Sequence, residues 1–329
     1  MAGAAVQFLV SALTIIAAGS LLTRFADKLS EQTGLGRLLI GSILLAGATS
    51  MPEIIVDLNV LSIGQPDLAV GDLFGSSLFN LLILMAVSAY FPWGDTGFEQ
   101  LSQQHSLAAA LGIVLTSIIG LGLISNLEFA LLGAGLFPWF ALICYLLGMW
   151  LLFKDEGKTD VGQEPERSPR KLLRATGGFS ACAAVILVAA PYLAESADEL
   201  ARVTGLGGSF IGATLVALST SMPELVSTIA AFRMRCPDLA AGNVFGSNMY
   251  NMVMFLPLDW YYTGNLLRAS SDINAMTAMG VTFCASVTVV TLIHPPSGKK
   301  ALLAGNGLVA LSILGVLFLL YYAGGSNTR

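Results

Sequence analysis

Residues 38–80 read LLIGSILLAGATSMPEIIVDLNVLSIGQPDLAVGDLFGSSLFN, and residues 209–251 read SFIGATLVALSTSMPELVSTIAAFRMRCPDLAAGNVFGSNMYN. A shift of 171 residues aligns the two stretches without a gap and makes 18 of 43 positions identical. The match extends upstream, where ADKLSEQTGLG from Ala26 aligns with ADELARVTGLG from Ala197. Similarity of this length indicates an internal duplication.

The composition around these stretches is that of an integral membrane protein. The 329 residues are 55% hydrophobic and only 11% charged, whereas soluble domains carry about 25% charged residues. A membrane-spanning helix needs about 20 apolar residues, and helices satisfy their own backbone hydrogen bonds in lipid. The sequence therefore predicts an all-α membrane protein with ten transmembrane helices near residues 3–23, 38–62, 67–91, 106–125, 129–153, 175–195, 209–232, 238–262, 275–294 and 301–322.

Lysine and arginine accumulate in cytoplasmic loops and so predict the orientation of the chain. With both termini outside, 13 of the 16 basic residues fall on the cytoplasmic side and three, Arg202, Arg268 and Arg329, fall outside. The longest polar stretch, residues 154–174, is then a cytoplasmic linker. We expect the protein to lie in the cell (inner) membrane as a multi-pass protein.

The linker divides the chain into a first repeat, residues 1–153, and a second repeat, residues 175–329, with five predicted helices each. Because five is an odd number, the two repeats enter the membrane from opposite sides. Such an inverted-topology repeat is typical of transporters that work by alternating access.

Several other classes of protein are disfavoured. The net charge of −5 and the lack of a long basic stretch argue against a nucleic-acid partner. The four cysteines show no CxxC spacing, so we interpret them as apolar filler, and no cofactor is expected. Asp72 stands in a sequence similar to the GxGD motif of intramembrane aspartyl proteases, but Ala69 replaces the first glycine. We therefore expect no enzymatic activity.

Each repeat carries the sequence TSMPE, at Thr49–Glu53 and at Thr220–Glu224. Proline cannot donate a helical hydrogen bond, so we expect Pro52 and Pro223 to break their helices near the middle of the membrane. The freed backbone carbonyls can then face a cation. These carbonyls belong to Ala46, Thr49, Ala217 and Thr220.

A second motif follows in each repeat, as Gly75-Ser76-Ser77 and as Gly246-Ser247-Asn248. We expect these triplets to interrupt their helices in the same way, to present hydroxyl groups and to allow close helix packing.

Glu53 and Glu224 lie about halfway through their segments. A carboxylate at that depth costs several kcal/mol unless it is paired, protonated or bound to a cation. Together with carbonyl, hydroxyl and amide oxygens, two carboxylates form an all-oxygen site that suits Ca2+ and Na+. The alternative is that each glutamate only hydrogen-bonds neighbouring helices.

The motifs GATSMPE with GDLFGSSLFN, and LSTSMPE with GNVFGSNMYN, resemble the two alpha repeats of the cation/calcium exchanger (CaCA) superfamily, most closely the sodium/calcium exchangers of prokaryotic type. The resemblance implies that Glu53 and Glu224 bind Ca2+ with backbone oxygens of Thr49 and Thr220, and that Asn80 reaches the centre of the cluster. It also implies two sodium sites, one served by Ala46, Ser50 and Ser76 and the other by Ala217, Ser221 and Ser247. In that family the first and sixth helices slide across the other eight.

The sequence departs from the family pattern at two positions. Many members have aspartate where this chain has Asn251, so potassium dependence is not expected. Asp57 stands where members often have a small hydroxyl residue and where the second repeat has Thr228. Because it lies one helical turn after Glu53, we expect Asp57 to line the route of the ion. The alternative is a solvated carboxylate at the outer vestibule.

The predicted function is antiport of Ca2+ against Na+ by alternating access, with the lipid bilayer as the surroundings and a monomer as the working unit. A Ca2+/H+ exchanger is the nearest alternative, although the additional glutamate of the GN-type motif in proton-coupled relatives is missing. A cation channel is the other alternative, since paired acidic residues also occur in pores.

Overall fold

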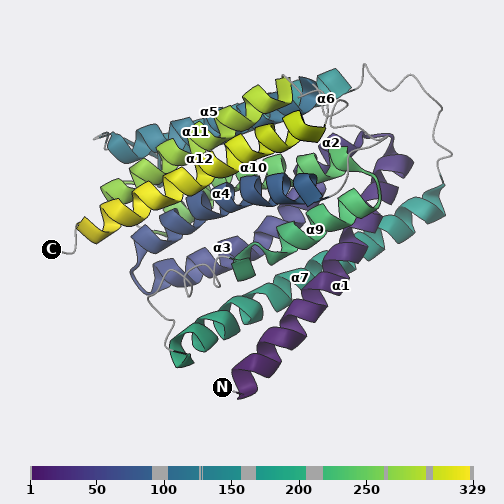
Figure 1. Ribbon diagram of the computed structural model, residues 1–329, viewed down its shortest axis with the longest axis horizontal. Helices are drawn as coiled ribbons and strands as arrows, with labels where there is room; N and C mark the ends of the chain where they lie inside the picture. The colour runs from purple at the N-terminus through teal and green to yellow at the C-terminus, as the bar shows by residue number, and fades with distance from the viewer. Residues whose placement is uncertain are drawn as a thin grey trace. The chain divides into compact units, whose positions relative to one another are not determined.

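The computed structural model describes residues 2–90, 103–125, 127, 129–156, 168–204, 218–262, 266–293 and 299–326. This part of the chain is almost entirely helical (Figure 1). The elements are α1 (Ala2–Thr33), α2 (Arg37–Ile40), the π-helix η1 (Gly41–Leu45), α3 (Ala46–Ser62), α4 (Pro66–Tyr90), α5 (Gln103–Ile124), β1 (Ala130–Leu131), β2 (Ala134–Gly135), α6 (Leu136–Glu156), α7 (Pro169–Val203), α9 (Met222–Arg233), α10 (Pro237–Tyr261), α11 (Asp272–Ile293) and α12 (Lys299–Ser326).

Every predicted apolar segment contains a helix. Among the described residues, seven helical stretches are long and apolar enough to cross a membrane: Gly3–Thr33, Arg37–Ser62, Pro66–Tyr90, His105–Ile124, Leu136–Lys154, Pro169–Val203 and Asp272–Ile293. Many large hydrophobic side chains on them are exposed, as at Leu13 and Val188, which fits a surface covered by lipid. A total of ten crossings remains a prediction.

The chain divides into two compact units. The first comprises Met1–Val56 and Glu156–Ser247, and the second comprises Asp57–Asp155 and Asn248–Arg329. Each unit therefore combines helices from both halves of the sequence, and the division falls inside α3 and inside α10. The predicted division into repeats 1–153 and 175–329 is a different one, and it remains a prediction.

In the first unit, α1 packs along α7 and also contacts α9, α2 and η1 (Figure 1). Small residues allow the helices to approach closely: a Cβ atom on Gly178 of α7 would lie 2.3 Å from the Phe25 ring of α1. The core between these elements is apolar and includes Leu22, Leu45 and Ile186.

In the second unit, α11 packs against α5, α12 and α4, and α4 also contacts α12. The rings of Phe74 on α4 and Phe255 on α10 lie 5.5 Å apart. The short β1–β2 hairpin is held by Asp259 of α10, whose carboxylate accepts a hydrogen bond from the Gly135 backbone N–H at 2.6 Å.

The predicted break at Pro52 is wrong, because α3 continues as one α-helix through that residue. A proline removes only one backbone donor, and membrane helices tolerate it where neighbouring groups compensate. The irregular backbone lies earlier, in the π-helix η1. In the second repeat the prediction is confirmed, since Ser221 lies in a turn and α9 begins at Met222, with Pro223 in its first turn.

The predicted interruptions at Gly75–Ser77 and Gly246–Asn248 are also wrong, because α4 and α10 are uninterrupted helices. The hydroxyl of Ser77 donates to the Leu73 carbonyl at 2.9 Å within the helix, so a serine here fits regular helical geometry. The predicted close packing is confirmed at Gly246, where an added Cβ would lie 2.6 Å from the backbone of Ser42.

Candidate cation-binding site

Glu224 is the best-defined carboxylate of the predicted site. It lies in the first turn of α9 and is completely buried. Its Oε1 atom accepts a hydrogen bond from the Ser50 hydroxyl of α3 at 3.2 Å. Within the described residues its Oε2 atom has no hydrogen-bond partner. The partial positive charge of a helix N-terminus stabilises a carboxylate placed there, and the second oxygen is available to a ligand.

This contact joins the two TSMPE motifs, since Ser50 belongs to the first repeat and Glu224 to the second. The predicted residues Glu53, Thr220 and Ser221 are buried as well, with at most 6% of their surface exposed. Glu53 and Ser50 lie on α3, whereas Thr220 and Ser221 immediately precede α9. The structure therefore brings polar groups of both motifs into the interior of the first unit.

Thr49 and Asn243 extend this polar set toward α10. The Thr49 hydroxyl lies 3.2 Å from the Ala46 carbonyl and 3.3 Å from the Asn243 Oδ1 atom. The Asn243 amide in turn donates to the Thr228 hydroxyl at 3.4 Å. All four residues are fully buried. The Ala46 carbonyl is thus close to a polar network, whereas Ala217 lies outside the described residues.

Close backbone contact fixes α10 against α2 and η1 in this unit. An added Cβ on Gly242 would lie 2.6 Å from the Leu38 carbonyl, and one on Gly41 would lie 2.8 Å from the Leu239 carbonyl. Only glycine permits such an approach. Ser247, the residue after Gly246 on α10, is fully buried.

A second polar set lies in the second unit, where α4 meets the later part of α10. The Asn80 amide donates to the Asn248 Oδ1 atom at 3.0 Å, and the Asn251 amide lies 3.4 Å from the Ser77 hydroxyl. Ser76 is buried on the same helix as Asn80. The Oδ1 atom of Asn80 has no hydrogen-bond partner among the described residues, so it is available to a ligand.

These two contacts are equivalent under the sequence repeat. A shift of 171 residues converts Asn80 into Asn251 and Ser77 into Asn248. Asn80 contacts Asn248. Its equivalent, Asn251, contacts Ser77, which is the equivalent of Asn248. Reciprocal contacts of this kind are what a two-fold axis produces, and they support the predicted relation between the repeats.

Asp57 is buried with none of its surface exposed. The alternative of a solvated vestibule carboxylate is therefore wrong. Neither of its carboxylate oxygens has a hydrogen-bond partner in the described part of the chain. The carboxylate of Asp72 on α4 lies close enough for the two charges to interact. Asp57 is thus a buried carboxylate beside the half-buried Asp72, and among the described residues neither forms an ion pair.

The sequence analysis missed the role of Asp72 as a neighbour of Asp57. The repeat contained the signal, because Asp57 and Asp72 align with Thr228 and Asn243. Those two residues form a neutral hydrogen bond in the second repeat. The first repeat thus has an acidic pair where the second has an uncharged one.

The atoms in both polar sets that could coordinate a cation are oxygen atoms of carboxylates, amides, hydroxyls and carbonyls. Among the described residues no group of three or more His, Cys, Asp or Glu could hold a metal ion. Oxygen ligands of this kind suit hard cations such as Na+ and Ca2+. Whether the two sets form one site remains a prediction.

Comparison with known proteins gives a consistent result. The family model for the sodium/calcium exchanger protein matches residues 3–154 and 174–323. The chain is 28% identical over 316 residues to the inner membrane protein YrbG of Escherichia coli (strain K12), covering 93% of this chain and 95% of that protein. It is 40% identical over 93 residues to the sodium/calcium exchanger MaX1 of Methanosarcina acetivorans, covering 26% of each chain.

The solved structure of the sodium-calcium exchanger NCX_Mj, soaked with 2.5 mM Na+ and 10 mM Sr2+, superposes with a TM-score of 0.73 at 17% identity, covering 94% of this chain and 98% of that chain. This similarity shows the same fold. The matched family model covers nearly all of the sequence, including both TSMPE motifs. The chain therefore belongs to the sodium/calcium exchanger protein family.

Proposed function

We propose that this membrane transporter exchanges Ca2+ for Na+ by alternating access, with Glu53 and Glu224 as the charged ligands of the central site. The observation that carries the proposal is the contact of Ser50 with Glu224, which joins the motifs of both repeats around a buried carboxylate. Two carboxylates match the charge of one Ca2+ ion, and several Na+ ions can use the same oxygens in turn.

The remaining predicted ligands surround these carboxylates in the proposal. Backbone and side-chain oxygens of Thr49 and Thr220 complete the Ca2+ site with Asn80. The sodium sites use Ala46, Ser50 and Ser76 on one side, and Ala217, Ser221 and Ser247 on the other. Asn251 is an uncharged neighbour, and Asp57 lines the route of the ion.

The protein functions in this proposal as a monomer in the cell membrane, with both termini outside and residues 154–174 in the cytoplasm. Basic residues in the first unit support this orientation. They lie at the end of α1, the start of α2, the start of α7 and the end of α9, and include Lys28, Arg37, Arg174 and Arg235. The Ser168 backbone N–H donates a hydrogen bond to Gln32 at 3.1 Å, which joins the end of α1 to the start of α7.

Ca2+ uptake into proteoliposomes tests the proposal. An outward Na+ gradient should drive uptake when no proton gradient is present, and collapsing the Na+ gradient should stop it. Uptake that follows only a proton gradient would favour Ca2+/H+ exchange. Uptake that needs no counter-ion and follows the membrane potential alone would favour a channel.

A further inference from the structure

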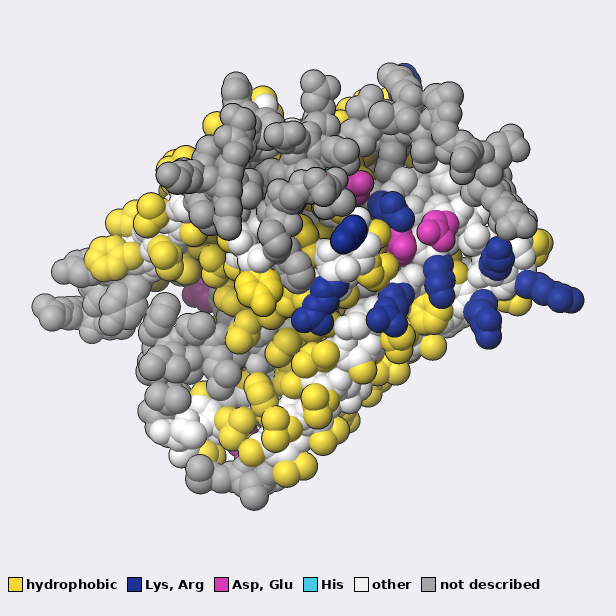
Figure 2. Space-filling model, turned by 45° about the vertical axis from the view of Figure 1, so that its right-hand side comes forward, with side chains coloured by type: hydrophobic (Ala, Val, Ile, Leu, Met, Phe, Trp, Pro, Cys, Tyr) yellow, Lys and Arg dark blue, Asp and Glu magenta, His cyan; other side chains and the backbone are white. Residues whose placement is uncertain are grey.

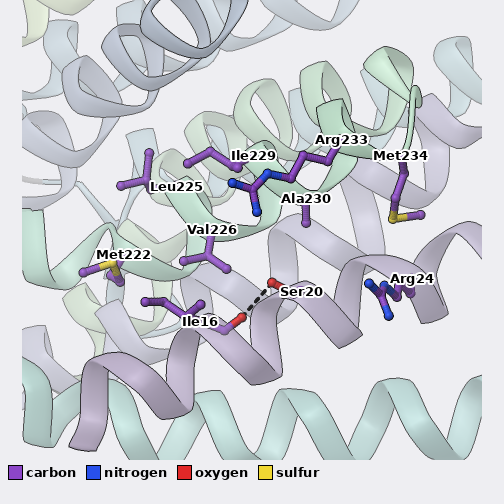
Figure 3. Close-up of a pocket in the computed structure, with 10 residues that line it drawn as sticks. All are labelled: Ile16, Ser20, Arg24, Met222, Leu225, Val226, Ile229, Ala230, Arg233 and Met234. Atoms are coloured by element: carbon purple, nitrogen blue, oxygen red, sulfur yellow. Dashed lines mark hydrogen bonds between the residues drawn. The ribbon is translucent and has the colours of Figure 1, made fainter. Parts of the chain in front are cut away.

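A groove of about 400 Å³ lies between α1 and α9 in the first unit (Figure 3). One wall consists of residues spaced one helical turn apart on α1, and the other is a single face of α9. The lining residues are Ile16, Ser20 and Arg24 on α1, and Met222, Leu225, Val226, Ile229, Ala230, Arg233 and Met234 on α9 and directly after it.

The two helices touch along one side of this groove. A Cβ atom on Gly19 would lie 2.9 Å from the Val226 side chain, and the Thr23 hydroxyl lies 3.4 Å from the Ser227 carbonyl. Apart from Arg24, Arg233 and Ser20, the side chains that line the groove are apolar. The Ser20 hydroxyl donates to the Ile16 carbonyl at 2.7 Å within its own helix, so it is already hydrogen-bonded. The groove therefore offers a surface suited to a hydrocarbon chain.

Two arginines line the groove toward its Met234 end, Arg24 from α1 and Arg233 from the last turn of α9, and the Arg233 side chain turns back toward Ile229 (Figure 3). Both side chains are exposed. Within the described residues neither guanidinium forms an ion pair or a hydrogen bond, and the lining contains no aspartate or glutamate. Figure 2 shows Lys and Arg side chains gathered in one band on the molecular surface, next to a broad area of hydrophobic side chains.

The dimensions of the groove match one leaflet of a bilayer. Eight residues separate Ile16 from Arg24 and eleven separate Met222 from Arg233, which corresponds to roughly 12 and 16 Å at about 1.5 Å per residue. Half of a bilayer's hydrocarbon core is about 15 Å thick. An acyl chain along the walls would therefore place its head group at the arginines. Guanidinium groups bind phosphate well, and basic pockets between membrane helices bind anionic head groups.

We propose that this groove binds an anionic phospholipid, with one acyl chain against α1 and α9 and its phosphate between Arg24 and Arg233. A lipid held in this way bridges two helices of the first unit. The proposal does not depend on which ions the protein transports, because its test measures lipid binding directly.

Native mass spectrometry of delipidated full-length protein tests this site, with phosphatidylglycerol and phosphatidylcholine as probes. The double variant Arg24→Gln/Arg233→Gln should bind at least about tenfold less phosphatidylglycerol than the parent protein, with phosphatidylcholine binding unchanged. The matched control Arg174→Gln/Arg235→Gln removes two exposed arginines that do not line the groove, and it should bind phosphatidylglycerol as the parent does.

A second pair of variants tests the apolar wall without altering charge. Ile16→Trp should fill the groove and reduce phosphatidylglycerol binding, whereas Leu13→Trp, on the lipid-exposed surface of the same helix, should not. Equal phosphatidylglycerol binding by the parent and the arginine double variant would overturn the proposal. An equal loss in the control double variant would also overturn it, because it would indicate general attraction to basic residues.

Discussion

Glu53 and Glu224 occupy equivalent positions of the repeat but different helical surroundings. Glu224 lies in the first turn of α9, where the helix dipole stabilises its charge, whereas Glu53 lies within α3. Both side chains are buried, with at most 1% of their surface exposed. The two carboxylates are therefore expected to differ in affinity for a cation, although both contribute charge to the same proposed site.

Replacing either glutamate by glutamine should reduce Ca2+ transport by more than about tenfold, because each variant removes half of the charge that offsets dehydration of the ion. Radioactive Ca2+ flux in proteoliposomes measures the effect. Glu199→Gln, which alters an exposed carboxylate on α7, should transport normally. Thermal unfolding of all three variants should resemble that of the parent. Normal transport by both site variants would exclude these residues as ligands.

The acidic pair of Asp57 and Asp72 should also affect ion binding. Asp72→Asn restores the residue type found at position 243, and Asp57→Ser introduces a hydroxyl like that of Thr228. Each change should lower the apparent Ca2+ affinity several-fold, because it removes a negative charge near the proposed route.

The ionic-strength dependence of this effect identifies its mechanism. Asp57 is buried and Asp72 is half-buried, and charges shielded from solvent are poorly screened. The loss in both variants should therefore persist when choline chloride is raised at constant Na+. A loss that disappears at high ionic strength would indicate long-range attraction instead. Unchanged affinities for Ca2+ and Na+ at low ionic strength would exclude a role for the pair in ion binding.

At the scale of elements, the repeat motifs predict which helices carry the site but not how each helix is built. The same TSMPE sequence lies inside a continuous helix in α3 and at a helix start in α9. Proline removes one hydrogen-bond donor in both, and the surrounding packing decides whether the helix continues. Packing also decides that the triplets Gly75-Ser76-Ser77 and Gly246-Ser247-Asn248 do not interrupt α4 or α10. The π-helix η1 was not predicted either.

The close contact of α10 with η1 predicts that alanine substitutions at the equivalent residues Gly75 and Gly246 differ in their effect on stability. Gly246→Ala should lower the free energy of unfolding by about 1–3 kcal/mol, the usual cost of overpacking, because its Cβ would collide with the Ser42 backbone. Gly75→Ala is the matched control, since nothing lies within 4 Å of its added Cβ. Thermal denaturation in detergent measures both. Equal stability of the two variants would contradict the observed packing.

At the scale of the whole molecule, composition and periodicity predicted the helical membrane class and located helices in all ten segments. The duplication predicted two related repeats, and the corresponding contacts of Asn80 with Asn248 and of Asn251 with Ser77 agree with this. The sequence did not predict the two compact units, which divide inside α3 and α10. Packing between distant segments determines such units, and hydropathy does not report on it.

Potassium independence is a prediction for the intact transporter. Asn251 is uncharged, whereas many family members have aspartate there, including those that cotransport potassium. Ca2+ uptake driven by a Na+ gradient should therefore proceed at the same rate when choline replaces K+ on both sides of the membrane. A strict requirement for K+ would contradict this expectation. Asn251→Asp tests the position itself, and the added carboxylate should increase the sensitivity of uptake to K+.

Equilibrium binding of Ca2+ to the purified protein, titrated against Na+, tests the central claim most directly. The proposed site predicts that Na+ displaces Ca2+ competitively, and that Glu53→Gln and Glu224→Gln each lose this binding while remaining folded. Isothermal titration calorimetry in potassium-free buffer with choline as the replacement cation separates competition from ionic strength. Ca2+ binding that is unaffected by Na+, or that survives in both glutamine variants, would contradict a shared site for the two ions.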